Sequence, residues 1–457
     1  MTSIAEYLSN SAVENVSRAI TAAKENESFN AFISLTEERA QERAQLVDSS
    51  EHKGRLAGVP FVVKDNYLTF GAPTTAASKI LKNFQAPLQA SVIEKLEAEG
   101  AICIGKANLD AFAHGGSTEN SAYGPTKNAH DQTRVAGGSS GGSAVVTALN
   151  IVPFALGSDT GGSIRQPASF NGVYGIKPTY GMVSRFGVVA MASGTDSMGC
   201  FATTAEDAEL VMDIIAGKDS KDMTTLDDFF TPETIAAPKK FGIIKELMTD
   251  DVDEQVRNAV LQYADSLRAL GHEVEEVNMP IIKYSLAMYY IIVPAEITSN
   301  LARYDGIRYG ARAQEAKTLS EVYGLSREQG FMAENKRRIM IGSYVLSSGF
   351  FDAYYMKAQK ARTLLIAAYN SVFESYDVLL SPVSPTPAFK IGQNTDDPIK
   401  MYLEDAMTVP PSLAGIPAIS VPAGSSTEGL PIGVQLTAKA KDDALLLAVA
   451  KQTEVHK

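Results

Sequence analysis

Three segments of the sequence contain residue types that could form a nucleophilic serine site. They are Lys64 in GVPFVVKDN, the run GGSSGGS at residues 137–143, and GSDTGGSIRQPA at residues 157–168. A serine hydroxyl becomes a nucleophile when a neighbouring base takes its proton. A lysine does this only when it is neutral, which costs about 4.6 kcal/mol at pH 7 because its ordinary pKa is ~10.4. Burial lowers that pKa. Since Lys64 follows the apolar run VPFVV, we expect it at the end of a buried strand, and on this pattern alone an ordinary structural lysine is the preferred interpretation.

The two glycine- and serine-rich runs also allow other interpretations. GGSSGGS is typical of a flexible linker. Glycine-rich loops at helix N-termini bind phosphates, although the sequence has neither GxGxxG nor GxxxxGK[ST]. GGSSG also fits the GxSxG nucleophile elbow of α/β-hydrolases. That elbow needs a strong strand before it and a His after it. Here the preceding HDQTRVA is polar, His272 lies in a predicted β-α-β unit, and His456 lies next to the C-terminus. Because both runs adjoin apolar elements, we favour loops whose backbone approaches a ligand closely.

The composition disfavours several classes of protein. The 457 residues include 41 Lys and Arg and 53 Asp and Glu, a net charge of −12, so a broad nucleic-acid-binding face is not expected. Five His and two Cys occur without CxxC or HxxxH spacing, which disfavours zinc sites and disulfide scaffolds. Cys103 lies in an apolar run and Cys200 has no nearby His, so we interpret both as packed thiols. For His114 we favour a structural role.

The sequence predicts a cytoplasmic protein that does not enter a membrane. The start, MTSIAEYLSNSAVENV, lacks the basic and apolar regions of a targeting peptide. The most apolar stretch, residues 287–295, is far shorter than the ~20 residues that span a bilayer.

Strands alternate with helices along the chain, which predicts an α/β fold around a largely parallel or mixed sheet. Strands are expected at residues 58–65, 101–106, 151–157, 240–244, 272–277, 377–382, 418–424 and 430–438. Helices are expected at residues 12–23, after 36, at 91–100, 144–149 and 253–270, over most of 284–376, and at 444–451. The composition does not change between these elements, so we expect one large domain.

Residues 137–168, GGSSGGSAVVTALNIVPFALGSDTGGSIRQPA, together with Lys64 upstream, resemble the signature of the amidase signature family. The resemblance covers most of the chain, from about residue 30 to residue 456. It implies a single large amidase-signature domain over 1–457, with a mixed central β-sheet covered by helices on both faces. Within it we expect an N-terminal helical part at about 1–54 and a catalytic signature core at about 55–205.

The resemblance also implies a Ser–cis-Ser–Lys triad. Ser163 would be the nucleophile that forms an acyl ester, Ser139, preceded by a cis peptide bond, would relay the proton, and Lys64 would be the general base. An oxyanion hole is expected from the backbone amides of Thr160, Gly161 and Gly162, with that of Ser163. We interpret Asp159 and Arg165 as an ion pair that holds this loop.

Residues 117–128, 300–310 and 336–363 are most similar to one branch of the family, the A subunits of amidotransferases that convert Glu-tRNA(Gln) or Asp-tRNA(Asn). This implies a glutaminase that passes ammonia to a partner in a heterotrimer with B and C subunits. The aminoacyl-tRNA, ATP and Mg²⁺ would be used by the partner, and this chain would bind no metal or cofactor. The N-terminal helical part and residues 437–441 are less typical of the family, which bears on subunit contacts more than on catalysis.

The branch implies that glutamine contacts Tyr289, Arg338 and Asp405. The fork of Arg338 suits an α-carboxylate, and Asp405 can receive an α-ammonium group. Tyr290 and Arg337 are adjacent alternatives. Two other functions stay open at this point, a free-standing amidase-signature amide hydrolase and a catalytically silent scaffold.

Overall fold

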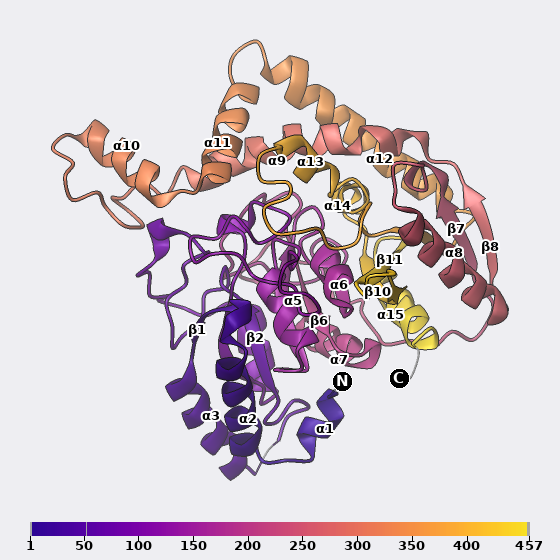
Figure 1. Cartoon of the computed structure of the whole chain (residues 1–457), viewed down its shortest axis with the longest axis horizontal. Coiled ribbons are helices and arrows are strands. Elements are labelled where there is room, and N and C mark those ends of the chain that lie inside the picture. The colour runs from indigo at the N-terminus through magenta and orange to yellow at the C-terminus, as the bar shows by residue number, and fades with distance from the viewer. Residues whose placement is uncertain (1, 52, 455–457) are drawn as a thin grey trace.

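A computed structural model describes residues 2–51 and 53–454 and places an eleven-stranded mixed sheet at the centre of the molecule (Figure 1). His52 and His456 lie outside the described residues. The strand order across the sheet is β1-β3-β2-β4-β6-β5-β10-β11-β9-β7-β8. The bounds are β1 Phe32–Leu35, β2 Pro60–Lys64, β3 Ile102–Ala107, β4 Phe154–Asp159, β5 Tyr174–Lys177, β6 Ser197–Ala202, β7 Lys240–Ile244, β8 Glu273–Val277, β9 Val378–Pro382, β10 Ala418–Ser425 and β11 Pro431–Ala438.

Parallel pairing in one half of the sheet brings three strand ends together. β2 pairs in parallel with both β3 and β4, since α4 (Ser91–Ala98) and α5 (Gly141–Ala148) carry the chain back between them. The carboxyl ends of these strands therefore lie at one edge, the position where open α/β sheets bind ligands. Lys64 ends β2 and Asp159 ends β4.

Helices cover both faces of the sheet. Along β2, Phe61 and Val63 belong to one apolar cluster and Val62 to another, the alternation of a strand buried on both sides. The first face is covered by α4, α7 (Ala205–Ile215), α8 (Glu254–Ala269) and α15 (Asp443–Gln452). The opposite face is covered by α2 (Ala12–Glu25), α3 (Glu37–Ser49), α5 and α6 (Arg165–Asn171). The expected architecture is thus confirmed.

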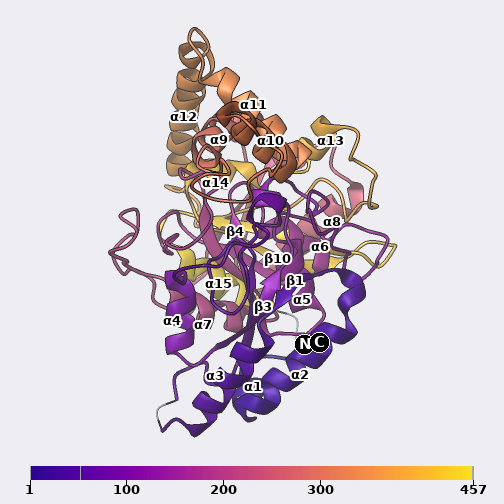
Figure 2. The ribbon, with the colours of Figure 1, turned by 90° about the vertical axis from the view of Figure 1, so that its left-hand side faces the viewer.

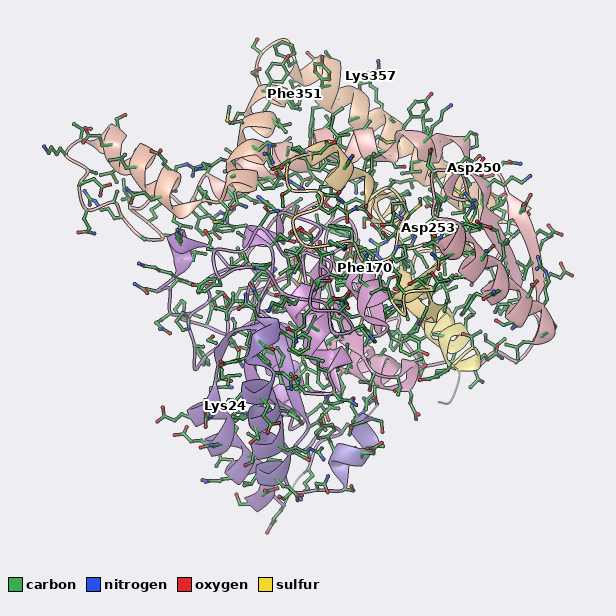
Figure 3. All side chains as sticks on the ribbon, viewed as in Figure 1. Lys24, Phe170, Asp250, Asp253, Phe351 and Lys357 are labelled. Atoms are coloured by element: carbon green, nitrogen blue, oxygen red, sulfur yellow. The ribbon has the colours of Figure 1, made fainter. Side chains whose placement is uncertain are left out.

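A helical arm extends from the sheet (Figures 1 and 2). It contains α9 Ser285–Leu301, α10 Leu319–Gly330, α11 Ala333–Val345, the π-helical turn η6 Phe351–Met356 and α12 Lys357–Val372. Figure 3 labels Phe351 and Lys357 where the arm turns back. Residues Pro280–Leu301 are long and apolar enough to cross a membrane by length and composition. Half of that segment is buried, where it packs against α11 and α12 as a core helix does.

Most predicted elements are present, with differences of a few residues at their ends. Three short helices complete the fold: α1 Ile4–Leu8, α13 Pro398–Leu403 and α14 Val409–Ala414. The prediction lacks β1, β5 and β6. The strand β1 is only four residues long and half-buried at an edge. β5 and β6 contain Gly175 and Gly199, which weaken a strand pattern. A Cβ on Gly199 would strike the carbonyl of Ile176, so close approach of the two strands requires that glycine.

Candidate active site

Lys64 lies fully buried at the carboxyl end of β2 and contacts hydroxyl groups. Its Nζ donates to Ser139 Oγ at 2.7 Å, to Ser158 Oγ at 3.0 Å and to Ser158 O at 3.3 Å. Parallel pairing of β2 with β4 places Ser158 there, because Val63 faces Leu156 in the register. No local sequence pattern singles out Ser158, since only the pairing of the two strands brings it to Lys64.

Burial lowers the pKa of Lys64 to about 7, against the opposing effect of the Asp110, Asp159 and Asp196 carboxylates. Removing the ammonium from water disfavours its charged form. At neutral pH the Lys64 amine is therefore neutral in a substantial fraction of the molecules. This is the condition that a lysine base requires, and it follows from the position of Lys64 at the end of a strand covered on both faces.

The loop that contains Ser139 is held by backbone contacts. The peptide bond between Gly138 and Ser139 is cis, as the resemblance implies. Asp110 N donates to Ser139 O at 3.2 Å, and Gly138 N donates to Gln166 Oε1 at 2.9 Å. Ser139 is fully buried, so its hydroxyl is confined beside the Lys64 amine.

Ser163 lies in the neighbouring loop, with a little solvent exposure. Ser140 N donates to Ser163 O at 3.2 Å, which joins the two glycine-rich loops. Ser163 is 8% exposed, whereas Ser139 and Lys64 are at 0%, so Ser163 is the member of the three that a substrate can reach. Among the described residues no hydrogen bond joins the hydroxyls of Ser163 and Ser139. The structure thus places Lys64 and Ser139 in direct contact and Ser163 in the loop beside them.

A buried ion pair fixes the loop around Ser163. Arg165 Nη2 lies 2.8 Å from Asp159 Oδ1, and both side chains are fully buried, in agreement with the sequence interpretation. Asp159 also accepts the Gly162 amide at 2.8 Å and the Ile164 amide at 3.1 Å. The Gly162 amide is therefore engaged within the loop. By contrast, the amides of Thr160, Gly161 and Ser163 donate to no group in the described part of the chain.

Of the three residues expected to bind substrate, Tyr289 contacts this loop, and Arg338 and Asp405 act electrostatically on Tyr289. Tyr289 packs against Gly161, whose Cβ would lie 2.6 Å from the Tyr289 hydroxyl. Arg338 is buried, and its Nε donates to Glu334 Oε1 at 2.8 Å. The residue Asp405 accepts a hydrogen bond of 2.8 Å from the hydroxyl of Tyr290.

Tyr290 contacts both Arg338 and Asp405. The sequence did not reveal this link. The Arg338 guanidinium lies 5.3 Å from the centre of the Tyr290 ring, and that ring stacks on Tyr402 with a centroid separation of 4.0 Å. Arg337, the alternative to Arg338, has a side chain that is 44% exposed, against 4% for Arg338. Tyr289 contacts the loop of Ser163 and Tyr290 contacts Asp405, so both tyrosines are part of this cluster. Of the two arginines, only Arg338 is buried.

Burial raises the pKa of Asp405 to about 6, despite the hydrogen bond from Tyr290 and the charge of Arg338. Asp405 precedes a turn that contacts the nucleophile loop, because Thr408 Oγ1 donates to Gly161 O at 2.6 Å. The site therefore combines a buried guanidinium, which is paired with Glu334, and a carboxyl group on a turn that contacts the loop of Ser163.

Several buried polar atoms near Gly116 have no hydrogen-bond partner among the described residues. They are Gln166 Nε2, Ser117 Oγ and His114 Nε2. A Cβ on Gly116 would lie 3.5 Å from Asp405 Oδ1 and 3.8 Å from Gln166 Nε2. The other ring nitrogen of His114 contacts Asn335 Nδ2 at 2.8 Å, which supports a role for His114 in positioning α11. No sequence signal identified Gln166, because its role depends on the loops' folded arrangement.

The thiols do not take part in this site. Cys103 and Cys200 are free and buried. Burial raises the pKa of Cys103 to about 11 and that of Cys200 further, so neither forms a thiolate at neutral pH. Both act as packed side chains, as the sequence predicts.

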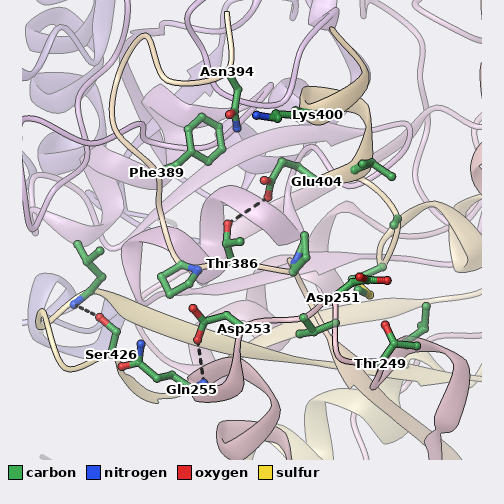
Figure 4. Close-up of a pocket in the computed structure, with 18 of the residues that line it drawn as sticks. Thr249, Asp251, Asp253, Gln255, Thr386, Phe389, Asn394, Lys400, Glu404 and Ser426 are labelled. Carbon is green, nitrogen blue, oxygen red and sulfur yellow. Dashed lines mark hydrogen bonds between the residues drawn. The ribbon is translucent and has the colours of Figure 1, made fainter. Parts of the chain in front are cut away.

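A separate cavity of about 900 Å³ is lined in part by Glu404 and Met407, which are close to Asp405 in the sequence (Figure 4). Glu404 points into it and accepts hydrogen bonds from Ser384 Oγ at 3.0 Å and Thr386 Oγ1 at 3.4 Å. Burial raises the pKa of Glu404 to about 7. Neither Lys64 nor the two serines line this cavity, so it is distinct from the catalytic loops.

Comparison with solved structures supports the same scaffold. The crystal structure of the A subunit of glutamyl-tRNA(Gln) amidotransferase from Thermotoga maritima is similar, with 40% identity and a TM-score of 0.83, covering 98% of this chain and 93% of that chain. A bacterial aryl acylamidase of the amidase signature family is 25% identical with a TM-score of 0.86, covering 98% and 95%.

Sequence relatives match over nearly their whole length. The A subunit of glutamyl-tRNA(Gln) amidotransferase from Geobacillus kaustophilus is 50% identical over 94% of this chain and 91% of its own. The protein of the same name from Koribacter versatilis is 48% identical over 94% and 92%. The amidase family model matches residues 13–447. The chain therefore belongs to the amidase family.

Proposed function

We propose that this chain is the glutaminase subunit of a tRNA-dependent amidotransferase. It would hydrolyse glutamine to glutamate and ammonia, and a partner subunit would use the ammonia to amidate Glu-tRNA(Gln), Asp-tRNA(Asn) or both. The observation that carries this proposal is the 48–50% identity, over more than nine-tenths of both chains, to subunits named for that activity. The aryl acylamidase shares the scaffold at 25% identity, so a free-standing amide hydrolase is the alternative.

In the proposed mechanism, Ser163 Oγ attacks the side-chain amide carbon of glutamine. Its proton passes through the Ser139 hydroxyl to the neutral amine of Lys64. The proton then returns to the nitrogen of the tetrahedral intermediate, the carbon–nitrogen bond breaks, and ammonia leaves. An acyl ester on Ser163 remains. Water, deprotonated by the same route, then attacks the ester and releases glutamate. The 2.7 Å contact between Lys64 and Ser139 supports this relay.

The oxyanion of the tetrahedral intermediate needs hydrogen-bond donors. The predicted donors are the amides of Thr160, Gly161 and Gly162, with that of Ser163. Because Gly162 N is bonded to Asp159, we assign the main role to the other three amides, those of Thr160, Gly161 and Ser163. Losing one donor of this kind typically costs about 3–4 kcal/mol of transition-state stabilisation.

Arg338 and Asp405 provide opposite charges that suit the two ends of an α-amino acid. In the proposal, the α-carboxylate of glutamine pairs with Arg338, the α-ammonium pairs with Asp405, and Tyr289 positions the side-chain amide over Gly161. A simple aryl amide has neither charge, so these contacts favour glutamine as substrate.

The remaining parts of the reaction belong to other chains in this proposal. B and C subunits would complete a cytoplasmic heterotrimer, and the partner would hold the aminoacyl-tRNA and use ATP and Mg²⁺ to activate its carboxylate. No group of His, Cys, Asp or Glu within residues 2–51 and 53–454 is arranged to hold a metal ion. The chemistry assigned to this chain uses its own side chains and backbone amides.

Co-production with the candidate partner subunits tests the proposal. The complex should release glutamate and ammonia from glutamine, should do so faster with aminoacyl-tRNA and ATP, and should lose this activity in Ser163→Ala. A chain that purifies alone, hydrolyses simple aryl amides and ignores glutamine would establish the alternative instead.

A matched pair of arginine variants tests the substrate. Arg338→Lys keeps the charge but loses the fork, so the KM for glutamine should rise about ten- to a hundredfold, as expected for a lost hydrogen bond to a charged group. Arg337→Lys, on the exposed side of the same helix, should leave the KM unchanged. Equal effects of the two substitutions would remove Arg338 from the binding site.

A further inference from the structure

Asp110 is a fully buried carboxylate beside the catalytic loops that no sequence pattern assigns to the site. It follows β3 and begins the turn η3 (Ala111–Ala113). Its Oδ2 accepts the Thr118 amide at 2.9 Å, and its Oδ1 accepts the Asn120 amide at 3.0 Å. Both carboxylate oxygens are therefore fixed by the backbone of one loop.

The carboxylate lies between two glycines that leave room for it. A Cβ on Gly115 would come within 2.7 Å of Asp110 Oδ2, and a Cβ on Gly138 would collide with the same oxygen. Asp110 N also donates to Ser139 O at 3.2 Å. Asp110 thus contacts both residues of the Gly138–Ser139 segment, one through its side chain and the other through its backbone.

Several carboxylates act electrostatically on the Lys64 amine. Among the carboxylates that act on its amine, Asp110 has the largest effect, ahead of Asp159 and Asp196. Asp159 is already paired with Arg165, and Asp196 accepts a hydrogen bond from Thr160 Oγ1 and two more from the amides of Met191 and Ala192.

The next residue, Asp65, is paired with Lys106. Beside Asp110 itself, the charged groups are Glu119 and Lys64, and burial raises the pKa of Asp110 to about 7. Asp110 is the carboxylate of this group that both contacts the Ser139 loop and acts on Lys64.

We propose that Asp110 is a positioning residue with two linked effects. Its carboxylate, anchored by the Thr118 and Asn120 amides, packs against Gly138 and so positions the Gly138–Ser139 segment beside Lys64, and its negative charge favours the charged form of the Lys64 amine. This inference rests on the proposed serine hydrolase chemistry and deepens it. Because Asp110 and Lys64 act on each other electrostatically, the acid limb of the activity profile belongs to the pair rather than to either group alone.

Asp110→Asn tests the proposal through the pH dependence of Ser163 labelling by a fluorophosphonate. In that reaction Ser163 Oγ forms a bond to phosphorus, fluoride leaves, and the serine proton goes to the base. Removing the negative charge lowers the pKa of Lys64, so the acid limb should move to lower pH by about one unit. The maximal rate should fall about tenfold, because an Asn side chain has one acceptor oxygen and cannot accept both the Thr118 and the Asn120 amides, which weakens the anchor of the side chain that packs against Gly138.

Two control variants separate charge from structure. Asp110→Glu keeps the charge but adds a methylene between Gly115 and Gly138, so its rate should fall without movement of the acid limb. Asp207→Asn removes a buried carboxylate that also accepts a backbone amide, that of Ile4 at 3.2 Å, on the distant helix α7. It should label like the wild type.

The outcomes distinguish this inference from the proposed function. A folded Asp110→Asn chain with the wild-type acid limb would overturn the inference alone. If Asp110→Asn does not fold, Asp110→Ser replaces it, and failure of both to fold would confine Asp110 to a structural role and overturn the inference. A wild-type chain in which Ser163 never labels would overturn the proposed function together with it.

Discussion

Two lysines on neighbouring strands of this sheet are equally buried but have different partners. Lys64 ends β2 and contacts the hydroxyls of Ser139 and Ser158. Lys106 lies on β3, facing Val63 in the register. Its Nζ donates to Tyr67 O and Thr74 Oγ1 and, unlike that of Lys64, also lies 3.2 Å from a carboxylate oxygen, Asp65 Oδ1. A carboxylate partner stabilises the ammonium form of a lysine. A hydroxyl partner can accept a hydrogen bond from the ammonium form or donate one to the neutral amine. Similar burial in one sheet therefore suits one lysine to structure and the other to proton transfer.

Removing each amine should give opposite results. Lys64→Met should reduce kcat/KM about 10³-fold or more, because the proton of Ser139 then has no acceptor, while stability stays the same or increases. Lys106→Met leaves the buried Asp65 without its partner and should cost roughly 3–5 kcal/mol of stability. Steady-state kinetics and denaturant unfolding of both variants provide the measurement.

Similar kinetic losses per folded molecule in the two variants would contradict the distinction between them. A Lys64→Met chain that is inactive only because it unfolds would contradict it as well. Circular dichroism and melting temperature, recorded on the same samples, separate these cases.

The pH dependence sharpens the comparison. Because burial lowers the pKa of Lys64 to about 7, kcat/KM should rise as the pH increases through about 7. The unfolded chain keeps this lysine protonated up to its ordinary pKa of about 10.4, so the unfolded state binds more protons between pH 7 and 10. Wild-type stability should therefore gain up to about 1.4 kcal/mol per pH unit relative to Lys64→Met over this range.

Unfolding free energies of the two proteins at pH 7, 8 and 9 measure this difference. A constant difference across the three values would show that the Lys64 amine keeps an ordinary pKa in the folded chain.

The second hydroxyl partner of Lys64 should have a smaller effect. Ser158→Ala removes a 3.0 Å contact to the amine but leaves Ser139 in place, so kcat/KM should fall about tenfold, the value of roughly one hydrogen bond. Ser143→Ala is the matched control, because Ser143 Oγ donates to Leu156 O at 2.9 Å and has no contact with Lys64 among the described residues. Equal rates for the two alanine variants would remove Ser158 from the site.

The sequence supports the positions of Lys64, Ser139 and Ser163 through local patterns and resemblance. The apolar run before Lys64 predicts burial from the residues themselves, because strands buried on both faces contain such runs. The residues that complete the site depend on contacts between distant segments. Ser158 reaches Lys64 through strand pairing, and Tyr290 reaches Asp405 across 115 positions of sequence. No local pattern encodes such contacts.

A third buried lysine tests whether a lowered pKa is sufficient for a base. Burial lowers the pKa of Lys177 to about 7, with a further decrease from Arg165 and opposing effects of Asp159 and Asp443. Its Nζ donates to Pro178 O at 2.8 Å and contacts no serine of the two loops in the described structure. Lys177→Met should therefore reduce kcat/KM by less than about tenfold, far below the effect of a lost general base.

The expected result separates two explanations of why Lys64 is reactive. If the lowered pKa were the whole cause, Lys177 would be an equally good base, and its removal would matter only if it lay in the proton path. If hydroxyl contact is the cause, activity follows Lys64 alone. The kinetics of Lys177→Met at pH 7 and 9 decide between the two explanations, and the melting temperature shows whether the buried charge network is intact. A large loss of activity in a stable variant would place Lys177, at the end of β5, in the proton path.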